Sequence, residues 1–404
     1  MTIAVTAPSF ASVRERERLR VMVVDDAVVV RAMISRWVEA EPDMQIVASM
    51  RGAPEAIDQM ERKNPDVVIL DVTMPDMDGI SALPRLLEKK RNLVVLMVST
   101  LTRRNAEISL HALSLGAADY VPKPEGDREL MSSDSFRREL IDKIRVLGSR
   151  RKHGHSERRT APVTDGNGTQ RELTALDGES CIDEACIDVP GMAVAAADAG
   201  NVVLRPFPSM TPRVLLIGSS TGGPPALNAI LGAIGKVIDN APVLITQHMP
   251  PTFTTILAEH LARASGRPAA EARDGERIRA GHIYVAPGGL HMRVARCDGS
   301  PVIALDDGPP IHFCKPAVDS LFASAAALWG SWNLGVVLTG MGCDGALGAA
   351  QLVAAGGGVI AQDEASSAVW GMPGRVAQAG LASAVLPLDQ IAPKIVRLFY
   401  GGRS

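Results

Sequence analysis

Short apolar runs alternate with segments of helical periodicity in the first third of the chain. Runs at 20–24, 67–70, 93–98 and 118–121 predict buried strands, and residues 28–39 carry apolar positions on one helical face. Alternating strands and helices favour a parallel, doubly wound sheet. In such sheets ligands bind beyond the carboxyl ends of the strands, so the polar residues that follow each run are the candidates for chemistry.

The alternation stops after Leu147 and resumes near residue 211. Apolar runs at 282–285 and 291–294 flank paired glycines and predict a β-hairpin. The other strands expected in this half are 213–217, 242–247, 334–338 and 358–361, and the expected helices are 225–235, 252–263, 316–329 and 345–354. The second half is therefore predicted to be a mainly parallel α/β domain with an added hairpin.

Residues 148–210 have the composition of a linker. A basic block at 150–159 precedes an acidic, Gly/Ala-rich stretch at 177–198, and neither can bury a core. We interpret 148–210 as a flexible tether between domains at 18–147 and 211–401, with a docking segment that uses the split charge as the alternative. The linker also carries Cys181 and Cys186, whose role the sequence leaves open.

Bulk composition excludes several classes. The 404 residues are too many for one ordinary domain, and a hydrophobic content of 46% supports well-filled cores. A net charge of -3 gives no reason to expect nucleic-acid binding. The five cysteines are scattered, which suggests reduced thiols. The first residues lack an apolar core followed by a cleavage site, so we expect no signal peptide, and no apolar run reaches membrane-spanning length. We therefore expect a soluble, cytoplasmic protein without membrane insertion.

Carboxylates follow two of the first four strands. Asp25, Asp26 and Asp71 would converge at one edge of the sheet, where their mutual repulsion calls for a hard cation such as Mg²⁺. Asp71 could then form an aspartyl phosphate, with Lys123 pairing with the phosphoryl oxygens and the Ser99 hydroxyl donating to one of them. Each residue alone also fits a helix cap or a solvated side chain. Their joint placement favours a phosphorylation site.

This domain resembles the receiver domain of two-component response regulators. The matching segments are 23–26, 70–75, 77–79, 98–99 and 120–124, which cover essentially the whole domain. The resemblance implies a flavodoxin-like fold, phosphorylation of Asp71 by a chemotaxis histidine kinase, and a Mg²⁺ requirement. It also implies that Ser99 and Tyr120 form the switch pair, beside Lys123.

In the second half, residues 213–225 predict a strand, a tight turn and a helix that begins with Pro224-Pro225. Gly218-x-Ser220-x-Gly222 fits the spacing of a nucleophile elbow. Taken alone, the turn fits a phosphate-binding or purely structural glycine turn as well. Ser219 lies as close to the turn as Ser220 does.

His248 and Asp344 strengthen the catalytic interpretation because each follows a buried strand, as Ser220 does. A serine needs a base, and a carboxylate orients that base and stabilises its cation. The chain order Ser, His, Asp differs from that of α/β-hydrolases, but a triad is defined by geometry. Four other histidines and three acids lack this combination. His260 fits a surface or packing role, Asp319 a helix-dipole role, and Asp306 and Asp307 a solvated loop. His282, His291 and His312 lie on or near the predicted hairpin and its following loop, where they are either substrate contacts or without a role.

The second half resembles the catalytic domain of chemotaxis protein-glutamate methylesterases. The matching motifs are 217–224, 246–250, 284–288, 316–319, 338–345 and 371–373. The resemblance implies a Rossmann-like esterase fold with Ser220 as nucleophile, His248 as base and Asp344 as orienting acid. Met341, together with Thr221 of the turn, would supply the oxyanion hole. Cys343, where a polar residue is common, and the long linker depart from the family pattern.

The expected protein is an α/β chain of two doubly wound, mainly parallel-sheet domains joined by a long linker. The resemblance implies a phosphorylation-activated esterase, without a cofactor of its own, whose unphosphorylated receiver covers the catalytic rim. It would act as a monomer on chemoreceptor cytoplasmic domains, hydrolysing glutamate γ-methyl esters and deamidating glutamines. Two rival interpretations are a nucleotide-binding second half, which lacks a Gly-Lys-Ser/Thr motif, and an inert, phosphorylation-switched adaptor.

Overall fold

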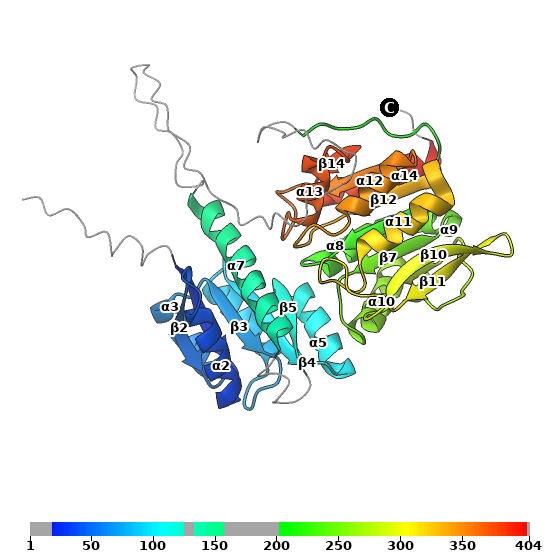
Figure 1. Cartoon of the computed structure of the whole chain (residues 1–404). Helices are drawn as coiled ribbons and strands as arrows, with labels where there is room; N and C mark the ends of the chain where they lie inside the picture. The colour runs from blue at the N-terminus through cyan, green and yellow to red at the C-terminus, as the bar shows by residue number, and fades with distance from the viewer. Residues whose placement is uncertain (1–17, 125–132, 157–201, 402–404) are drawn as a thin grey trace, which may run out of the picture.

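The computed structural model describes residues 18–124, 133–156 and 202–401, which form two α/β domains in contact with each other (Figure 1). The N-terminal domain contains a five-stranded parallel sheet in the order β2-β1-β3-β4-β5. Every side chain of β3, Val67–Asp71, is buried, as expected for a central strand covered on both faces. The other strands are β1 (Leu19–Val24), β2 (Met44–Met50), β4 (Val94–Thr100) and β5 (Asp119–Lys123).

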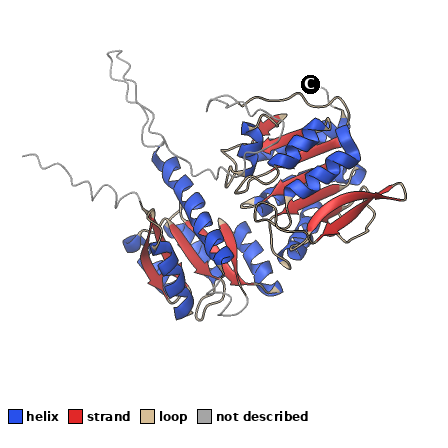
Figure 2. Ribbon diagram, in the orientation of Figure 1, coloured by secondary structure: helices blue, strands red, loops and turns tan. Residues whose placement is uncertain are grey.

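Helices cover both faces of this sheet (Figure 2). Helices α2 (Val28–Glu39) and α7 (Asp134–Ser156) pack on one face, and α3 (Ala53–Lys63), α4 (Gly79–Lys89) and α5 (Arg103–Ser114) pack on the other. The Asp78 side chain caps α4 by accepting a hydrogen bond from the Ser81 N–H at 2.8 Å. The predicted strands and the helix at 28–39 are confirmed, whereas β2 was not among the predicted elements.

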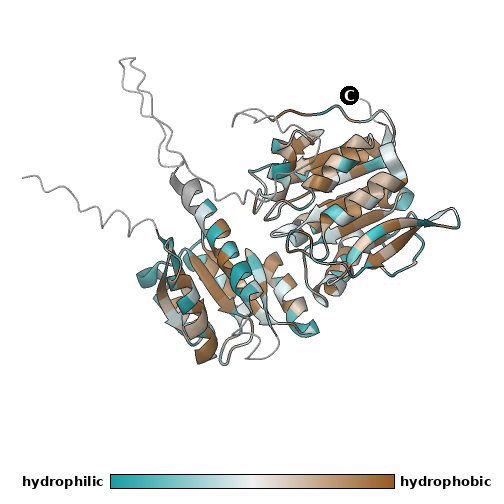
Figure 3. Ribbon diagram, in the orientation of Figure 1, coloured by the Kyte–Doolittle hydropathy of each residue, from teal (hydrophilic) through white to brown (hydrophobic). Residues whose placement is uncertain are grey.

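The C-terminal domain has a seven-stranded sheet in the order β14-β13-β12-β6-β7-β9-β8, with parallel pairing throughout. Its apolar strands lie between helical layers (Figure 3). The strands are β6 (Val214–Ser219), β7 (Val243–Gln247), β8 (Ala269–Glu271), β9 (Ile283–Val285), β12 (Asn333–Val337), β13 (Gly358–Gln362) and β14 (Ala384–Leu386). The helices are α8 (Gly223–Ala233), α9 (Gly235–Asn240), α10 (Phe253–Ser265), α11 (Val318–Trp329), α12 (Ala346–Ala354), α13 (Met372–Gln378) and α14 (Leu388–Tyr400), with a 3-10 turn, η3, at Gly330–Trp332.

The C-terminal domain contains a hairpin, but the strands predicted to form it are wrong. The run at 282–285 is β9, which pairs in parallel with β7 and β8, and the hairpin is instead β10 (His291–Cys297) with β11 (Ser300–Asp306). Asp298 and Gly299 form its turn, with φ of 47° and 77°. Gly288 does not form the hairpin turn. A Cβ at this position would lie 2.2 Å from the Pro251 backbone nitrogen, so the glycine allows its loop to pass close to the loop that carries Pro251.

The two domains meet along α5, which packs against α8 and α10 of the C-terminal domain (Figure 1). An ion pair links the two domains, with Arg103 Nη2 2.6 Å from Glu259 Oε1. The Arg138 guanidinium lies 4.9 Å from the centre of the Phe313 ring. A cavity of about 590 Å³ remains between the domains, so the contact is incomplete.

The segments next to the predicted linker are ordered onto the domains. Helix α7 continues to Ser156, beyond the predicted boundary at residue 147. On the other side, the Arg205 N–H donates to the Ala382 carbonyl at 2.9 Å, which ties residues near 205 to the C-terminal domain. Most of the predicted tether, with Cys181 and Cys186, lies outside the described residues. The exact domain limits therefore stay a prediction.

Candidate active site

Ser220 lies in the turn between β6 and α8, as predicted. Its N–H donates to the Thr339 carbonyl at 3.0 Å, which fixes the turn against the segment that follows β12. Gly222 adopts a φ of 75°, a left-handed conformation that glycine enters without steric cost. Prolines occupy the first turn of α8, where a backbone N–H would have no acceptor within the helix, so the missing N–H of proline carries no cost there.

Gln247 connects the Ser220 turn to the His248 turn. Its Oε1 accepts a hydrogen bond from the Ser219 hydroxyl at 2.6 Å. Its Nε2 donates to the carbonyls of Ser220 at 2.9 Å and His248 at 3.2 Å. Gly223 makes room for this amide, because a Cβ there would lie 2.0 Å from Gln247 Oε1. Gln247 was not among the predicted site residues, although a polar residue at the end of a buried strand was a signal that could have identified it.

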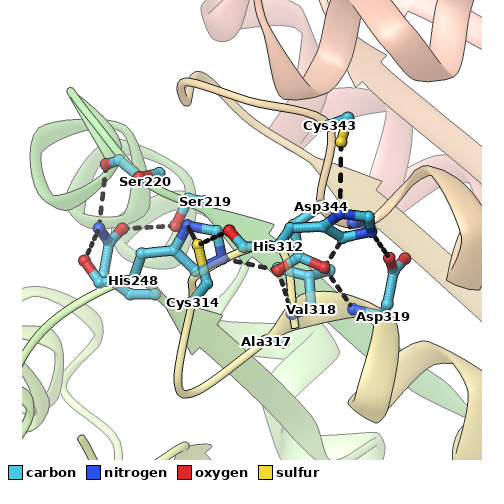
Figure 4. A network of polar contacts seen from close by, with 12 residues as sticks. Ser219, Ser220, His248, His312, Cys314, Ala317, Val318, Asp319, Cys343 and Asp344 are labelled. Atoms are coloured by element: carbon cyan, nitrogen blue, oxygen red, sulfur yellow. Dashed lines mark hydrogen bonds and ion pairs between the residues drawn. The ribbon is translucent and has the colours of Figure 1, made fainter. Parts of the chain in front are cut away.

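His248 and Asp344 come together as the triad hypothesis requires (Figure 4). His248 Nε2 lies 2.7 Å from Asp344 Oδ2, and the Asp344 carboxylate is buried. The same carboxylate accepts the backbone N–H groups of Val318 at 2.6 Å and Asp319 at 2.9 Å, at the start of α11. Burial acts to raise the pKa of Asp344, but the hydrogen bond and charge of His248 outweigh it and lower that pKa.

The other imidazole nitrogen faces a thiol. His248 Nδ1 lies 3.4 Å from Cys314 Sγ, and within the described residues His248 makes no hydrogen bond with the Ser220 hydroxyl. Burial acts to lower the pKa of His248, but Cys314 and Asp344 raise it to about 10. Cys314 was not among the predicted site residues, since nothing in the local pattern points a residue of this loop toward a histidine 66 positions away.

Thr221 and Met341 flank the serine. Thr221 is buried, and its carbonyl accepts the Thr339 hydroxyl at 2.8 Å, which fixes the peptide plane. In the part of the chain that the structure describes, neither the Thr221 N–H nor the Met341 N–H donates a hydrogen bond. Both N–H groups therefore lack a protein acceptor in that part of the chain. Met341 also packs against an apolar cluster made mainly of receiver residues.

The remaining candidates have structural partners. Asp319 is buried, accepts the Gly348 N–H at 2.6 Å and lies 3.5 Å from His312 Nε2, so it does more than favour a helix dipole. The hydrogen bond with Asp319 raises the pKa of His312. His291 accepts the Ala317 N–H at 3.2 Å and is buried, which makes it a packing residue.

The receiver carboxylates also converge. Oxygen atoms of Asp25, Asp26 and Asp71 lie within 4.8 Å of one another, and Lys123 Nζ lies 2.7 Å from Asp25 and 2.9 Å from Asp71. The pKa of Asp71 is raised to about 6, mainly because the carboxyl group is buried. Lys123 acts to lower this pKa, and the charges of Asp25 and Asp26 act to raise it further. A cation would relieve this repulsion, and the all-oxygen donor set suits Mg²⁺.

The predicted switch residues are both buried. The Ser99 hydroxyl lies 3.0 Å from the Ser109 hydroxyl on α5, and Tyr120 stacks against Phe253 of the other domain. Lys143 donates to the Tyr120 carbonyl at 2.7 Å, which anchors the start of β5 to α7. Ser99 is therefore bonded to the helix that packs against the C-terminal domain, and Tyr120 lies in the domain contact itself.

Two family models match the chain, one in each of its two domains. Residues 215–395 match the family model described as CheB methylesterase, and residues 21–133 match the response regulator receiver domain. No helix among the described residues is long and apolar enough to cross a membrane.

Full-length relatives are close. The chain is 59% identical over 404 residues, covering 100% of both chains, to the protein-glutamate methylesterase/protein-glutamine glutaminase of group 2 operon from Rhodopseudomonas palustris strain CGA009. It is 58% identical, again over 100% of both, to the protein-glutamate methylesterase/protein-glutamine glutaminase of Nitrobacter hamburgensis. Among solved structures, the Thermotoga maritima CheB methylesterase catalytic domain is 40% identical, with 47% of this chain and 100% of that chain covered and a TM-score of 0.45.

Proposed function

The chain belongs to the CheB methylesterase family, and on that premise we propose that it is a phosphorylation-activated serine esterase. It hydrolyses glutamate γ-methyl esters on methyl-accepting chemotaxis receptors, releases methanol, and so resets receptor sensitivity during adaptation. It also deamidates receptor glutamines, in keeping with the names of its relatives. The observation that carries the proposal is the 2.7 Å contact between His248 and Asp344 beside the Ser220 turn.

Ser220, His248 and Asp344 are the proposed triad. The Ser220 hydroxyl attacks the ester carbonyl carbon while His248 Nδ1 takes its proton, and Asp344 holds the ring through Nε2 and stabilises the imidazolium. His248 then protonates the leaving methoxide, and water, deprotonated by the same imidazole, hydrolyses the acyl-enzyme. A glutamine follows the same steps with ammonia as leaving group.

The proposed oxyanion hole consists of the Thr221 and Met341 N–H groups. Losing one such donor typically costs a factor of about 10² to 10³ in rate. In the described residues these donors have no other acceptor, which supports the assignment. The esterase chemistry draws on no cofactor.

In the receiver, Asp71 is the proposed acceptor of a phosphoryl group from a chemotaxis histidine kinase. Asp25, Asp26 and Asp71 would hold Mg²⁺, which neutralises phosphoryl charge when bound. Lys123 pairs with phosphoryl oxygens, since its ammonium already contacts Asp71 at 2.9 Å. Ser99 and Tyr120 form the proposed switch pair. We propose that the reaction takes place in the cytoplasm and that the chain acts as a monomer.

Regulation is proposed to act through the domain contact. Receiver residues contact two loops of the catalytic rim: Arg138 lies over Phe313, and Met341 packs against the receiver cluster. A substrate chain reaching Ser220 has to displace these contacts. Phosphorylation, which adds roughly -1.5 to -2 charges at Asp71, would shift the population toward an open rim.

A methanol-release assay on methylated receptor membranes, with and without acetyl phosphate, tests this function. We expect acetyl phosphate to raise the rate, Ser220→Ala to abolish it, and Asp71→Asn to lose the stimulation. A fluorophosphonate probe should label the native chain at Ser220 and leave Ser220→Ala unlabelled. Full turnover by Ser220→Ala would overturn the triad assignment.

A further inference from the structure

Cys314 occupies the side of His248 that faces away from Asp344. Its Sγ lies 3.4 Å from His248 Nδ1, and Asp344 lies 2.7 Å from Nε2, so thiol, imidazole and carboxylate form a continuous chain (Figure 4). We propose that Cys314 is a modification site: an imidazole-activated thiol that reacts with peroxides and alkylating electrophiles, and whose oxidation stops the esterase. Only the last consequence rests on the proposed function.

The arrangement supplies what a reactive thiol needs. The thiolate is the nucleophilic form, and an adjacent imidazolium favours it. Asp344 holds the proton on Nε2, which leaves Nδ1 as the acceptor for the proton of Cys314. Cys314 and Asp344 together raise the pKa of His248 to about 10 against the effect of burial, so this ring readily holds a proton beside the sulfur.

The other described cysteines lack this combination. Cys297 is exposed, but its sulfur lies 3.8 Å from the Asp298 carboxylate and, among the described residues, has no contact with an imidazole. Cys343 has an imidazole, that of His312, at 3.7 Å, but it is buried. Among the described residues, Cys314 alone is both partly accessible and in contact with an imidazole.

The loop that carries Cys314 holds the sulfur in place. Cys314 Sγ also lies 3.3 Å from the His312 carbonyl, and His312 and Phe313 adopt φ of 49° and 61°. The Phe313 ring is 85% exposed and lies under Arg138 of the receiver. Access to Cys314 is therefore expected to depend on the receiver position.

Oxidation by hydrogen peroxide would proceed in one step. The Cys314 thiolate attacks a peroxide oxygen, the O–O bond breaks, and the hydroxide that leaves takes the proton from the His248 imidazolium to give water. Sulfur loses two electrons and becomes a sulfenic acid, while the peroxide is reduced. The new S–O–H group stands at Nδ1, the atom that has to accept the Ser220 proton.

The first test is a pulse of iodoacetamide on the full chain at pH 6, with labelled sites quantified by mass spectrometry. We expect Cys314 to react at least about tenfold faster than the more exposed Cys297, and His248→Asn to remove that excess. The Cys297 rate in His248→Asn serves as the check on folding. Equal or slower labelling of Cys314, or an unchanged rate in a folded His248→Asn chain, overturns the proposal. This readout needs no ester hydrolysis.

The second test is peroxide treatment followed by the methanol-release assay. The native chain should lose most of its activity in parallel with sulfenic acid formation at Cys314, and a thiol reductant should restore it. Cys297→Ser, the matched control, should be inactivated as the native chain is, whereas Cys314→Ser should resist. Inactivation of Cys314→Ser at the native rate would contradict the proposed consequence.

Discussion

The ring of Tyr120 lies flat against the ring of Phe253, with centroids 4.6 Å apart and planes 6° apart. Tyr120 is the second residue of β5, the edge strand that ends at Lys123, and Phe253 is the first residue of α10 in the catalytic domain. The proposed switch residue is thus itself an interface residue. Any inward or outward movement of Tyr120 has to change the stacking between the domains.

Weakening this stack is expected to raise activity without phosphorylation. Phe253→Leu keeps an apolar side chain but loses the ring contact, which is worth about 0.5–1.5 kcal/mol and shifts the equilibrium about 2- to 10-fold toward the open form. Methanol release without acetyl phosphate should rise accordingly. Phe322→Leu is the matched control, because Phe322 is equally buried but lies in the catalytic core. A basal rate in Phe253→Leu no higher than in the control would refute this coupling.

Replacing Glu259 of the ion pair between the domains with arginine should also raise the basal rate, but by less than Phe253→Leu does. Glu259→Arg places like charges at the position where Arg103 and Glu259 are now 2.6 Å apart. Exposed pairs contribute about 0.2–1 kcal/mol, so the basal rate should rise by at most about fivefold. Adding Arg103→Glu should restore repression. Glu61→Arg, which breaks the exposed Lys89 pair inside the receiver, is the control and should change nothing.

Asp344→Asn is expected to reduce the rate constant kcat by roughly 10³- to 10⁴-fold with little change in KM, because an amide cannot stabilise the imidazolium or fix its tautomer. Steady-state kinetics with and without acetyl phosphate measures it. Asp389→Asn removes an exposed acid at the start of α14 and should leave kcat unchanged. A loss of less than tenfold would show that Asp344 holds the α11 backbone but does not assist His248.

The pH dependence of the unphosphorylated enzyme follows from His248, whose pKa of about 10 exceeds the ordinary 6.5. Only the neutral ring accepts a proton, so activity should climb from pH 7 toward pH 10. The stabilisation that Cys314 and Asp344 give the charged ring is complete below pH 6.5 and is lost as the pH rises through about 10. Ser220→Ala supplies the blank for spontaneous ester hydrolysis, and Cys314→Ala should move the rise to lower pH. A flat profile between pH 7 and 10 contradicts this assignment.

Ser109→Ala tests the hydroxyl pair in the receiver. Ser99 and Ser109 are both buried, and a Ser99 hydroxyl that turns toward a phosphoryl group has to leave its partner. Removing the partner should tighten binding of beryllofluoride with Mg²⁺ by up to about fivefold, equivalent to about 1 kcal/mol, and should lower the melting temperature. Ser114→Ala, an exposed serine on the same helix, is the control. Unchanged or weaker binding would exclude Ser109 as a restraint on the switch.

Much of the site could be predicted because it depends on local periodicity and one rule of topology. Apolar runs marked the central strands, and parallel strands end at one edge of their sheet. Asp25 and Asp71 therefore converge with Lys123, and His248 with Asp344, although they are distant in sequence. The residue type after each strand was enough to suggest the chemistry.

Tertiary structure alone decided what loops and domain contacts do. Gly288 was predicted to lie in a hairpin turn, but its missing side chain instead lets the Pro251 backbone pass close by. The sequence shows only that a glycine at this position can adopt many backbone conformations. Cys314 reaches His248 through a loop without periodicity, and Tyr120 meets Phe253 across two domains. Such contacts come from long-range packing, in which many small non-local interactions choose one loop path and one docking geometry, and a local pattern carries no record of that choice.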